Sequence, residues 1–377
     1  YTGVLVWPLL LMTVLIYPRT SVESESHWLR RGGGLIVAGL VGLLTLWAVY
    51  RFDAGTASSL PFSPWLPAPF YWQNIYRSLF EIVGDGDPKL FFLLGERSLD
   101  GWWTYFPVVF GVKTPLPSLL LMAAGVVVMV TNRLLRTSVQ LWAPPLAFFL
   151  LGLTGYLTIG YRHILPALPF LFAIAGYIGE WIASQRGMPQ RLGLLATALC
   201  LGWLAVDTAR IYPHHGSYFN ETAGPWTNWS NIVVDSNLDW GQDLPALRAV
   251  IDELGIEDVN LAYFGKGVPE EYGVRYRPLP GFLRFVEGAE LNAYNPLQPA
   301  PGWYAISATS LQLGLQQPES ADLYAYFRDL TPAARAGYSI YLYQVQAADD
   351  AAVTRRVLRD SPAWQQPDQL RLSLIHI

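Results

Sequence analysis

Residues 164–210 read ILPALPFLFAIAGYIGEWIASQRGMPQRLGLLATALCLGWLAVDTAR. Two apolar runs, 164–184 and 192–210, are separated by a short polar loop that carries Arg186 and Arg191. A membrane-spanning helix needs about 20 mainly apolar residues, so each run is close to sufficient. Short loops rich in Arg and Lys stay on the cytoplasmic side. The stretch therefore predicts two membrane crossings joined by a cytoplasmic loop.

The composition of the whole chain agrees with a membrane protein. Of its 377 residues 52% are hydrophobic and 14% are charged, with a mean hydropathy of +0.26, whereas a soluble domain carries about 25% charged residues. The 15 Trp and 21 Tyr suit membrane interfaces. A net charge of −4 gives no basic footprint for nucleic acid. The lone Cys200 excludes a disulfide within the chain and a cysteine-based zinc site.

The same pattern predicts six spans, of which the first is short: 1–17, 33–50, 115–131, 141–158, 164–184 and 192–210. The connecting segments alternate in charge. Three of them carry Arg and are expected in the cytoplasm: 18–32, 132–140 and 185–191. By parity the long loop 51–114, the turn 159–163 and everything after residue 211 are expected outside.

After Arg210 the apolar runs give way to alternating and turn-rich patterns. Four segments read as strands: Ile232–Val234, Val259–Phe264, Trp303–Ser307 and Ser339–Val345. Two read as amphipathic helices: Leu244–Leu254 and Ala321–Leu330. The expected organisation is a membrane region, 1–210, followed by an extracytoplasmic α/β domain, 211–371. Residues 372–377 resemble a translated sequencing adapter and are set apart from the fold.

Ionisable residues at the predicted outer membrane boundary are candidates for function. Lys113 directly precedes a span, and it could contact a lipid phosphate or simply extend to the interface. Arg162 and His163 lie in the turn between two spans, where a guanidinium suits a phosphate because its planar fork donates two hydrogen bonds. The alternative is a pair of interfacial anchors. The aromatic residues of loop 51–114 could likewise stack on sugars or sit among lipid headgroups.

The string DSNLDWGQDL, residues 235–244, allows three interpretations. The structural one makes Asp243 the N-cap of a helix that begins at Leu244. In the second, hard oxygens are offered to Ca²⁺ or Mg²⁺ by Asp235, Asn237, Asp239 and Asp243, although the spacing departs from a calcium loop. In the third, Trp240 is a stacking platform for an acceptor or carbohydrate.

Two further motifs follow the last span. His214 and His215 are adjacent, and neighbouring histidines of an extended chain rarely face one metal ion, so a water-exposed pair is expected. The triplets that begin at Asn220 and Asn228 match the N-glycosylation pattern.

Taken in order, four stretches resemble a known family. They are GERSLDGWWTYFPVVFGVKTPLP, GYRHILPALPFLFAIAG, YFNETAGP and VDSNLDWGQDL followed by LAYFGKGVPEEYGV. This set is similar to the C-terminal half of bacterial polyprenyl-phosphate-dependent glycosyltransferases of the GT-C superfamily, a group that includes protein O-mannosyltransferases and the lipid A aminoarabinose transferase. The similarity covers roughly residues 30–345.

The resemblance implies an enzyme of the plasma (inner) membrane. Such an enzyme moves a sugar from a polyprenyl-phosphate carrier to a lipid, glycan or protein acceptor on the outer face. Arg162 and His163, with Lys113, would bind the carrier phosphate, where a fixed cation stabilises developing charge. Glu96, Trp102 and Tyr105 would belong to the loop over the cavity. The resemblance assigns no role to the string DSNLDWGQDL, whose residue types alone make Asp235, Asn237, Asp239 and Trp240 a candidate ligand loop of the outer domain.

The family's catalytic acid lies in its first outer loop, which by parity would precede this chain. No acid here is therefore assigned as catalytic base, and this chain by itself is expected to be inactive. No cofactor is assigned, although a divalent metal could bind through that upstream half. The alternative function is a non-catalytic membrane protein whose outer α/β domain binds a glycan or a partner.

Overall fold

The computed structural model describes residues 26–80, 90–153, 160–280, 294–316 and 318–346. The predicted first span, 1–17, and the segment 372–377 lie outside the described residues. The chain divides into two compact units. The first comprises Tyr1–Asp87, Leu120–Leu151 and His163–Ala196, and the second comprises Pro88–Leu119, Gly152–Arg162 and Thr197–Ile377.

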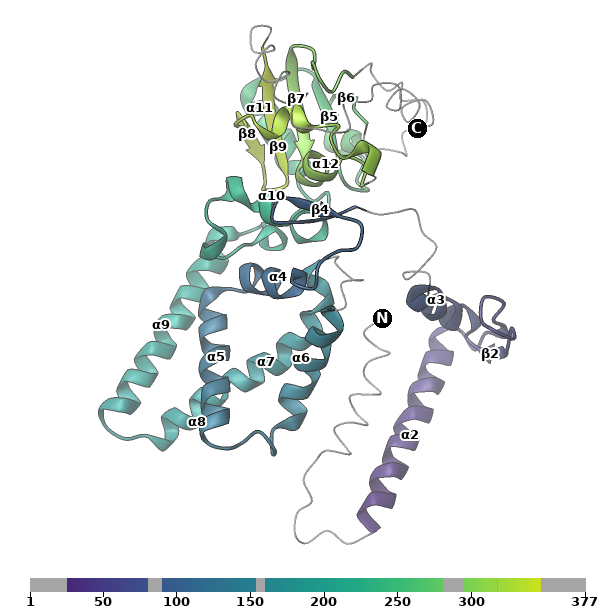
Figure 1. Cartoon of the computed structure of the whole chain (residues 1–377), viewed down its shortest axis with the longest axis vertical. Helices are drawn as coiled ribbons and strands as arrows, with labels where there is room; N and C mark the ends of the chain where they lie inside the picture. Colours follow the sequence, from purple (N-terminus) through teal and green to yellow (C-terminus); the bar gives the residue numbers. More distant parts are fainter. Residues whose placement is uncertain (1–25, 81–89, 154–159, 281–293, 317, 347–377) are drawn as a thin grey trace. The chain divides into compact units, whose positions relative to one another are not determined.

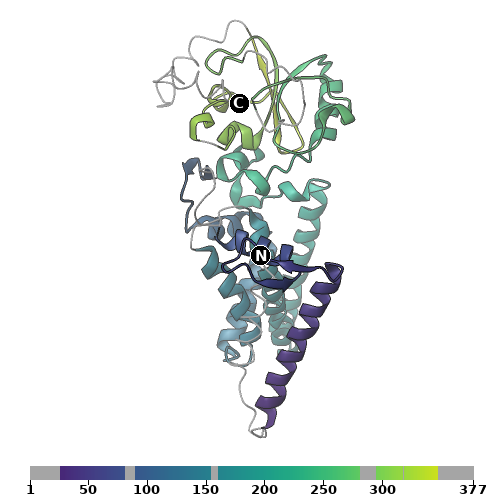
Figure 2. The same cartoon turned by 90° about the vertical axis from the view of Figure 1, so that its right-hand side faces the viewer.

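The first unit is mainly helical. Its helices are α2 (Ser26–Val49), α3 (Pro69–Phe80), α6 (Val139–Gly152), α7 (Leu168–Ala175) and α8 (Tyr177–Ser184). Two more, α5 (Leu116–Thr131) and α9 (Met188–Ile211), continue from one unit into the other. Directly after α2, drawn in purple in Figure 1 and Figure 2, the strands β1 (Ala54–Thr56) and β2 (Trp65–Pro67) pair antiparallel.

A glycine permits close packing between α5 and α7. A Cβ on Gly125 would lie 2.2 Å from the carbonyl oxygen of Ile174. Small residues at such a crossing let two backbones approach closely, as they do between helices within membranes.

Among the described residues, three helical segments are long and apolar enough to cross a membrane: Gly32–Val49, Leu165–Ser184 and Met188–Ile211. The pair α4 (Tyr105–Lys113) and α5 would add a fourth if it counts as one span, although it bends by 113°. The predicted crossings at 33–50, 164–184 and 192–210 therefore have helices of suitable length. The segment at 115–131 forms a helix of 16 residues, below the usual span. The described part of 141–158 belongs to α6, which has 14 residues, and residues 154–158 lie outside the described residues.

The second unit contains a mixed sheet of five strands in the order β6-β5-β7-β9-β8. These strands are β5 (Val259–Ala262), β6 (Tyr276–Pro278), β7 (Gly302–Ser307), β8 (Ala334–Ala336) and β9 (Ile340–Val345). The strand β5 is parallel to β6 and β7, and β9 is antiparallel to β7 and β8. A separate hairpin joins β3 (Phe91–Leu93) to β4 (Glu96–Ser98).

Helices cover both faces of this sheet, which accounts for its apolar central strands. On one face α11 (Leu244–Leu254) buries Leu247 and Ile251 in a core with Ala305 and Leu342. On the other, Phe327 of α13 (Ala325–Arg328) packs with its ring centroid 5.0 Å from Tyr304 and 5.2 Å from Tyr343. This unit also contains two short helices, α10 (Trp229–Ile232) and α12 (Ala308–Leu313).

The predicted sheet-containing domain is present, with three of its expected strands and α11 close to their predicted bounds. The predicted strand Ile232–Val234 is wrong. Ile232 ends α10, and Val233 and Val234 follow in extended form without joining a sheet. Their burial explains the apolar pattern, since both are at most 3% exposed. The carbonyl of Ile232 instead accepts from the backbone N–H of Leu94, at 2.8 Å.

The predicted helix Ala321–Leu330 is also mostly wrong, since only Ala325–Arg328 is α-helical. The side chain of Arg328 donates to the carbonyls of Leu311 and Ala321 and pairs with Asp322. The amphipathic pattern reflects burial rather than helix length, since Leu323, Tyr324 and Phe327 are at most 3% exposed.

Candidate functional site

The short helix α4 brings two of the predicted site residues inward. Tyr105 opens this helix and Lys113 ends it, and both lie on its buried face with Phe106 and Val109. This spacing places them on one side of the helix. Tyr105 and Lys113 therefore face the interior of the second unit.

The Tyr105 hydroxyl joins the turn at Gly160 to the string DSNLDWGQDL. It accepts from the Gly160 backbone N–H at 2.9 Å and from Asn237 Nδ2 at 2.7 Å. The Asn237 side chain also accepts from the backbone N–H of Tyr161, at 2.8 Å. Asn237 is 1% exposed, so these bonds are shielded from water. Gly160 has a φ of +78°, and a Cβ there would lie 2.2 Å from Ser236 Oγ.

Lys113 is directed into the protein. Its Nζ donates to the carbonyl of Gly216 at 3.0 Å and to that of Asn237. It also lies 4.5 Å from the centroid of the Phe219 ring, a distance that permits a cation–π contact. At 8% exposed, the side chain does not extend to solvent. Lys113 thus places a buried amine beside the segment that carries Asn237, and burial lowers the pKa of this amine to about 7.

Arg162 stacks on Trp240. The guanidinium carbon lies 4.8 Å from the centroid of the indole ring, and both side chains are exposed. The indole is held in place because its Nε1 donates to the Ser236 carbonyl at 2.7 Å. His163 ends the 3₁₀ turn η1 (Tyr161–His163) and is half-buried. The stacked pair gives the site an exposed cation with a fixed orientation.

We call the residues Tyr105, Lys113, Arg162, Asn237 and Trp240 the Asn237 cluster. They come from three separate stretches of sequence that the structure brings together. Glu96 is not among them, since it is an exposed residue of the β3–β4 hairpin. Trp102 is half-buried before α4, and its carbonyl accepts from the backbone N–H of Tyr105 at 3.2 Å.

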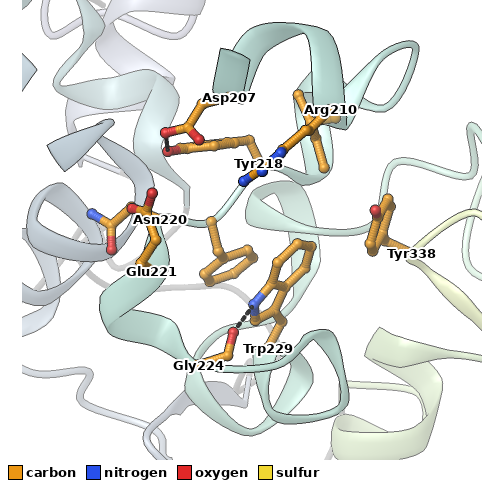
Figure 3. A pocket seen from close by; sticks show the side chains of 10 residues that line it. Asp207, Arg210, Tyr218, Asn220, Glu221, Gly224, Trp229 and Tyr338 are labelled. Atoms are coloured by element: carbon orange, nitrogen blue, oxygen red, sulfur yellow. Dashed lines mark hydrogen bonds between the residues drawn. The ribbon is translucent and has the colours of Figure 1, made fainter. Parts of the chain in front are cut away.

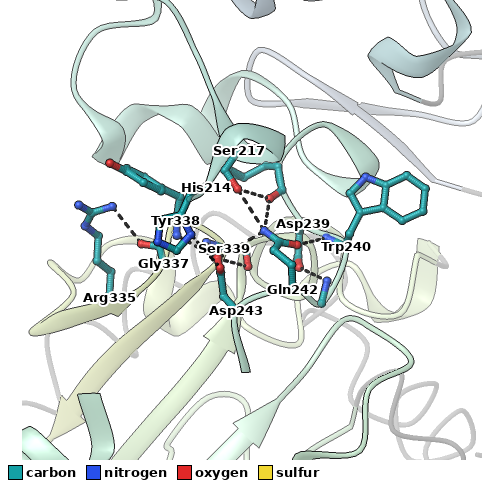
Figure 4. Close-up of polar contacts among 12 residues, drawn as sticks. His214, Ser217, Asp239, Trp240, Gln242, Asp243, Arg335, Gly337, Tyr338 and Ser339 are labelled. Atoms are coloured by element: carbon teal, nitrogen blue, oxygen red, sulfur yellow. Dashed lines mark hydrogen bonds and ion pairs between the residues drawn. The ribbon is translucent and has the colours of Figure 1, made fainter. Parts of the chain in front are cut away.

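Asp243 does not cap α11 through its side chain. It occupies the N-cap position, but its carboxylate makes no capping hydrogen bond. Oδ2 instead accepts from the backbone N–H groups of Tyr338 and Ser339, both at 3.0 Å, and from Ser339 Oγ at 2.9 Å (Figure 4). Oδ1 lies 3.2 Å from His214 Nδ1. The predicted N-cap position of Asp243 is confirmed but its predicted partners are wrong, because the β8–β9 turn that binds its carboxylate lies 95 to 96 residues away in the sequence.

Asp239 is a fully buried carboxyl in the same string. It accepts from the backbone N–H of Gly241 at 3.2 Å and from that of Thr309 at 3.3 Å. Removal from water disfavours the charged form, and this burial raises the pKa of Asp239 to about 8. Near neutral pH the carboxyl therefore carries a proton for much of the time.

The remaining acid, Asp235, also binds protein groups. It has a φ of +57°, its backbone N–H donates to Thr309 Oγ1 at 3.0 Å, and its carboxylate accepts from Gln316. No group of three His, Cys, Asp or Glu residues in the described parts of the chain is arranged to hold a metal ion. The contacts of all three acids favour the structural interpretation of the string, while Trp240, 55% exposed, remains the group available for stacking.

Asn220 has a role that sequence reasoning missed. It is 2% exposed, and its Nδ2 donates to the carbonyls of Gly111 and Thr114 at the C-terminal end of α4. Those carbonyls have no partner within the helix. Asn220 thus fixes the end of α4 that bears Lys113. Its position in the YFNETAGP stretch was the available signal, but the glycosylation pattern pointed elsewhere.

No protein-family model, no curated protein and no solved structure matches this chain.

Proposed function

We propose that this chain is part of a membrane-embedded glycosyltransferase of the GT-C type, which transfers a sugar from a polyprenyl-phosphate carrier to an acceptor. The observation that carries the proposal is the Asn237 cluster. Three of the stretches on which the resemblance rests supply its residues, and two of those residues are cations suited to a phosphate.

The two cations have different roles in this proposal. Arg162 is exposed, and its orientation on Trp240 leaves it at the surface of the unit, so it makes the direct contact with the carrier phosphate. Lys113 is buried against two carbonyls, so it acts as a positioning residue that holds the Asn237 segment and adds positive potential. Fixed charges of this kind stabilise the negative charge that develops on a leaving phosphate.

The sequence positions support a site at the membrane surface. Lys113 precedes the apolar helix α5, and Arg162 precedes the candidate span Leu165–Ser184. We propose further that the chain makes six crossings of the plasma (inner) membrane, with the sheet-bearing unit outside. The basic segments 18–32, 132–140 and 185–191 support this orientation. Labelling of single cysteines placed in these segments, with a membrane-impermeant reagent and Cys200 removed, tests it: outside labelling of 132–140 would contradict the orientation.

The catalytic test uses the intact gene product that contains this chain. Membranes bearing it are supplied with polyprenyl-phosphate sugars, and transfer to endogenous acceptors is measured for the wild type, Arg162→Ala and Arg275→Ala. Arg275 is an exposed arginine outside the Asn237 cluster and serves as the control. The proposal predicts transfer by the wild type and Arg275→Ala, and about a hundredfold less by Arg162→Ala. Retained transfer by Arg162→Ala would remove its proposed role. Glycan binding without transfer would favour the alternative, a non-catalytic membrane receptor.

A further inference from the structure

A cavity of about 230 Å³ lies where α9 ends and the segment 218–229 begins, within the second unit (Figure 3). None of the residues that line this cavity belongs to the Asn237 cluster. One wall is aromatic and consists of Phe219, Trp229 and Tyr338. The other is charged and consists of Asp207, Arg210 and Glu221. Pockets for drug-sized ligands have about 300–1,000 Å³, so this cavity suits a small group.

The aromatic wall is preformed. The rings of Phe219 and Trp229 are stacked with centroids 5.0 Å apart, and those of Trp229 and Tyr338 are 4.9 Å apart. Trp229 Nε1 donates to the Gly224 carbonyl at 3.1 Å, which fixes the central ring. Lys113 lies over the Phe219 ring and Arg335 over the Tyr338 ring, so the stack is closed at both ends and offers apolar ring edges with little conformational freedom to lose on binding.

The two carboxylates are held by aromatic donors rather than by cations. The Tyr218 hydroxyl donates to Asp207 Oδ2 at 3.3 Å, and Trp203 Nε1 donates to Glu221 Oε1 at 2.8 Å. Burial, with Asp207 and Glu221 nearby, raises the pKa of Tyr218, so the phenol keeps the proton that it donates. Across the described residues neither carboxylate forms an ion pair with Lys, Arg or His. The side chains of Asp207 and Glu221 also lie within hydrogen-bonding reach of each other, so the cavity presents a pair of acidic side chains that form no ion pair with a cation.

Arg210 adds a cation to the same cavity. It lies three residues after Asp207, on the last turn of α9, and its guanidinium is directed toward the aromatic wall in Figure 3. Since α9 is long and apolar enough to cross a membrane, its end would lie at headgroup depth. A guanidinium there suits a phosphate.

We propose that this cavity binds a ligand that carries a primary ammonium beside a phosphate, the chemistry of a phosphoethanolamine headgroup. The ammonium lies between Asp207 and Glu221 and donates hydrogen bonds to their oxygens, while the phosphate binds Arg210. A quaternary ammonium fits less well, because it has no N–H to donate and the rings form one wall rather than a cage. This inference is independent of the proposed transferase activity.

The test is calorimetric titration of the full chain in maltoside detergent with short-chain lipids. Dihexanoyl phosphatidylethanolamine is the probe, and dihexanoyl phosphatidylcholine is matched in charge but has a quaternary nitrogen. The ethanolamine lipid is expected to bind at least about tenfold more tightly. Glu221→Gln, at an exposed position, should weaken its binding about tenfold. Glu253→Gln, an exposed acid on α11, is the control and should change nothing.

Further arms identify the source of the ligand. Free phosphoethanolamine that binds as tightly as the lipid would assign the cavity to a soluble ligand of this chemistry, and weaker binding would assign it to membrane lipid. Either supports the proposal. Equal affinity for the two lipids, unchanged binding by Glu221→Gln, or displacement of the ethanolamine lipid by an equal concentration of a neutral monosaccharide would overturn it. Asp207→Asn is a second variant for the same binding measurement. If Asp207→Asn unfolds, the affinity measured with Glu221→Gln decides the test.

Discussion

Asn237 Nδ2 donates to the Tyr105 hydroxyl at 2.7 Å, although the two residues are 132 positions apart in the sequence. This bond joins α4 to the string DSNLDWGQDL, and both residues are almost fully buried. Each also binds the turn that precedes Arg162, since Gly160 donates to Tyr105 and Tyr161 donates to Asn237. The positions of Lys113 and Arg162 therefore depend on the side-chain amide of Asn237 and the phenol of Tyr105.

Breaking this link should lower stability in a coupled way. Asn237→Ala removes the acceptor for Tyr161, and Tyr105→Phe removes the acceptor for Gly160, so each is expected to cost about 1–3 kcal/mol. Because the two share a bond, the double variant should lose less than the sum of the single losses. Thermal unfolding in detergent measures this, with Tyr71→Phe as control, whose half-buried ring lies outside the cluster. Strictly additive losses would argue against a shared network.

Asp243→Asn separates two roles of one carboxylate. Asn is as good an N-cap as Asp, so a capping role predicts little change. The observed role, as acceptor for Tyr338, Ser339 and His214, predicts a loss of about 1–3 kcal/mol because the amide nitrogen cannot accept. The unfolding midpoints of the wild type and Asp243→Asn decide between them, and equal midpoints would restore the capping role.

Asp239 should make stability fall as pH rises. Its folded pKa of about 8 lies above the ordinary value of 3.8, so between these limits the folded state binds a proton that the unfolded state has released. The stability contributed by this proton is present at low pH and is lost as pH rises toward about 8, by at most about 1.4 kcal/mol per pH unit. Unfolding midpoints from about pH 5 to about pH 8 measure the slope. Asp239→Asn should flatten it, and an unchanged slope in that variant would contradict this origin.

Gly125 should not tolerate even a methyl group. Gly125→Ala would place its Cβ 2.2 Å from the Ile174 carbonyl oxygen and force α5 and α7 apart, at a cost of about 1–3 kcal/mol for overpacking. Gly179→Ala is the matched control, because this helical glycine has open space around its would-be Cβ, and helix propensity favours Ala there by about 1 kcal/mol. Equal unfolding midpoints for the two variants would refute the close crossing.

Much of the local structure was predictable from the sequence. The apolar runs gave α2 and α9, and periodicity with Pro245 in the first turn gave α11 at its observed bounds. The edge strands β6 and β8 were missed, since each has three residues and no alternating pattern of its own. Local pattern also misplaced a strand at Ile232–Val234, where tertiary burial rather than strand pairing explains the apolar residues.

The candidate site was predictable only in parts. Lys113, Arg162 and Trp240 were identified from charge, position and residue type in three separate stretches. Their convergence depends on bonds of Asn237 and Asn220 to distant partners, and nothing in local spacing specifies such bonds. The charged cavity was missed for the same reason, because Asp207 and Glu221 lie on different elements with aromatic donors between them.

The most direct measurement is the affinity of the chain in nanodiscs for a short polyprenyl phosphate. The wild type, Arg162→Ala and Arg275→Ala are compared at constant ionic strength. The account predicts saturable binding, unchanged in Arg275→Ala and weakened about tenfold to a hundredfold in Arg162→Ala, because a charge-assisted contact with the phosphate is lost. Equal affinity of all three proteins, or no binding by the wild type, would contradict the claim that Arg162 and the Asn237 cluster form a carrier-phosphate site.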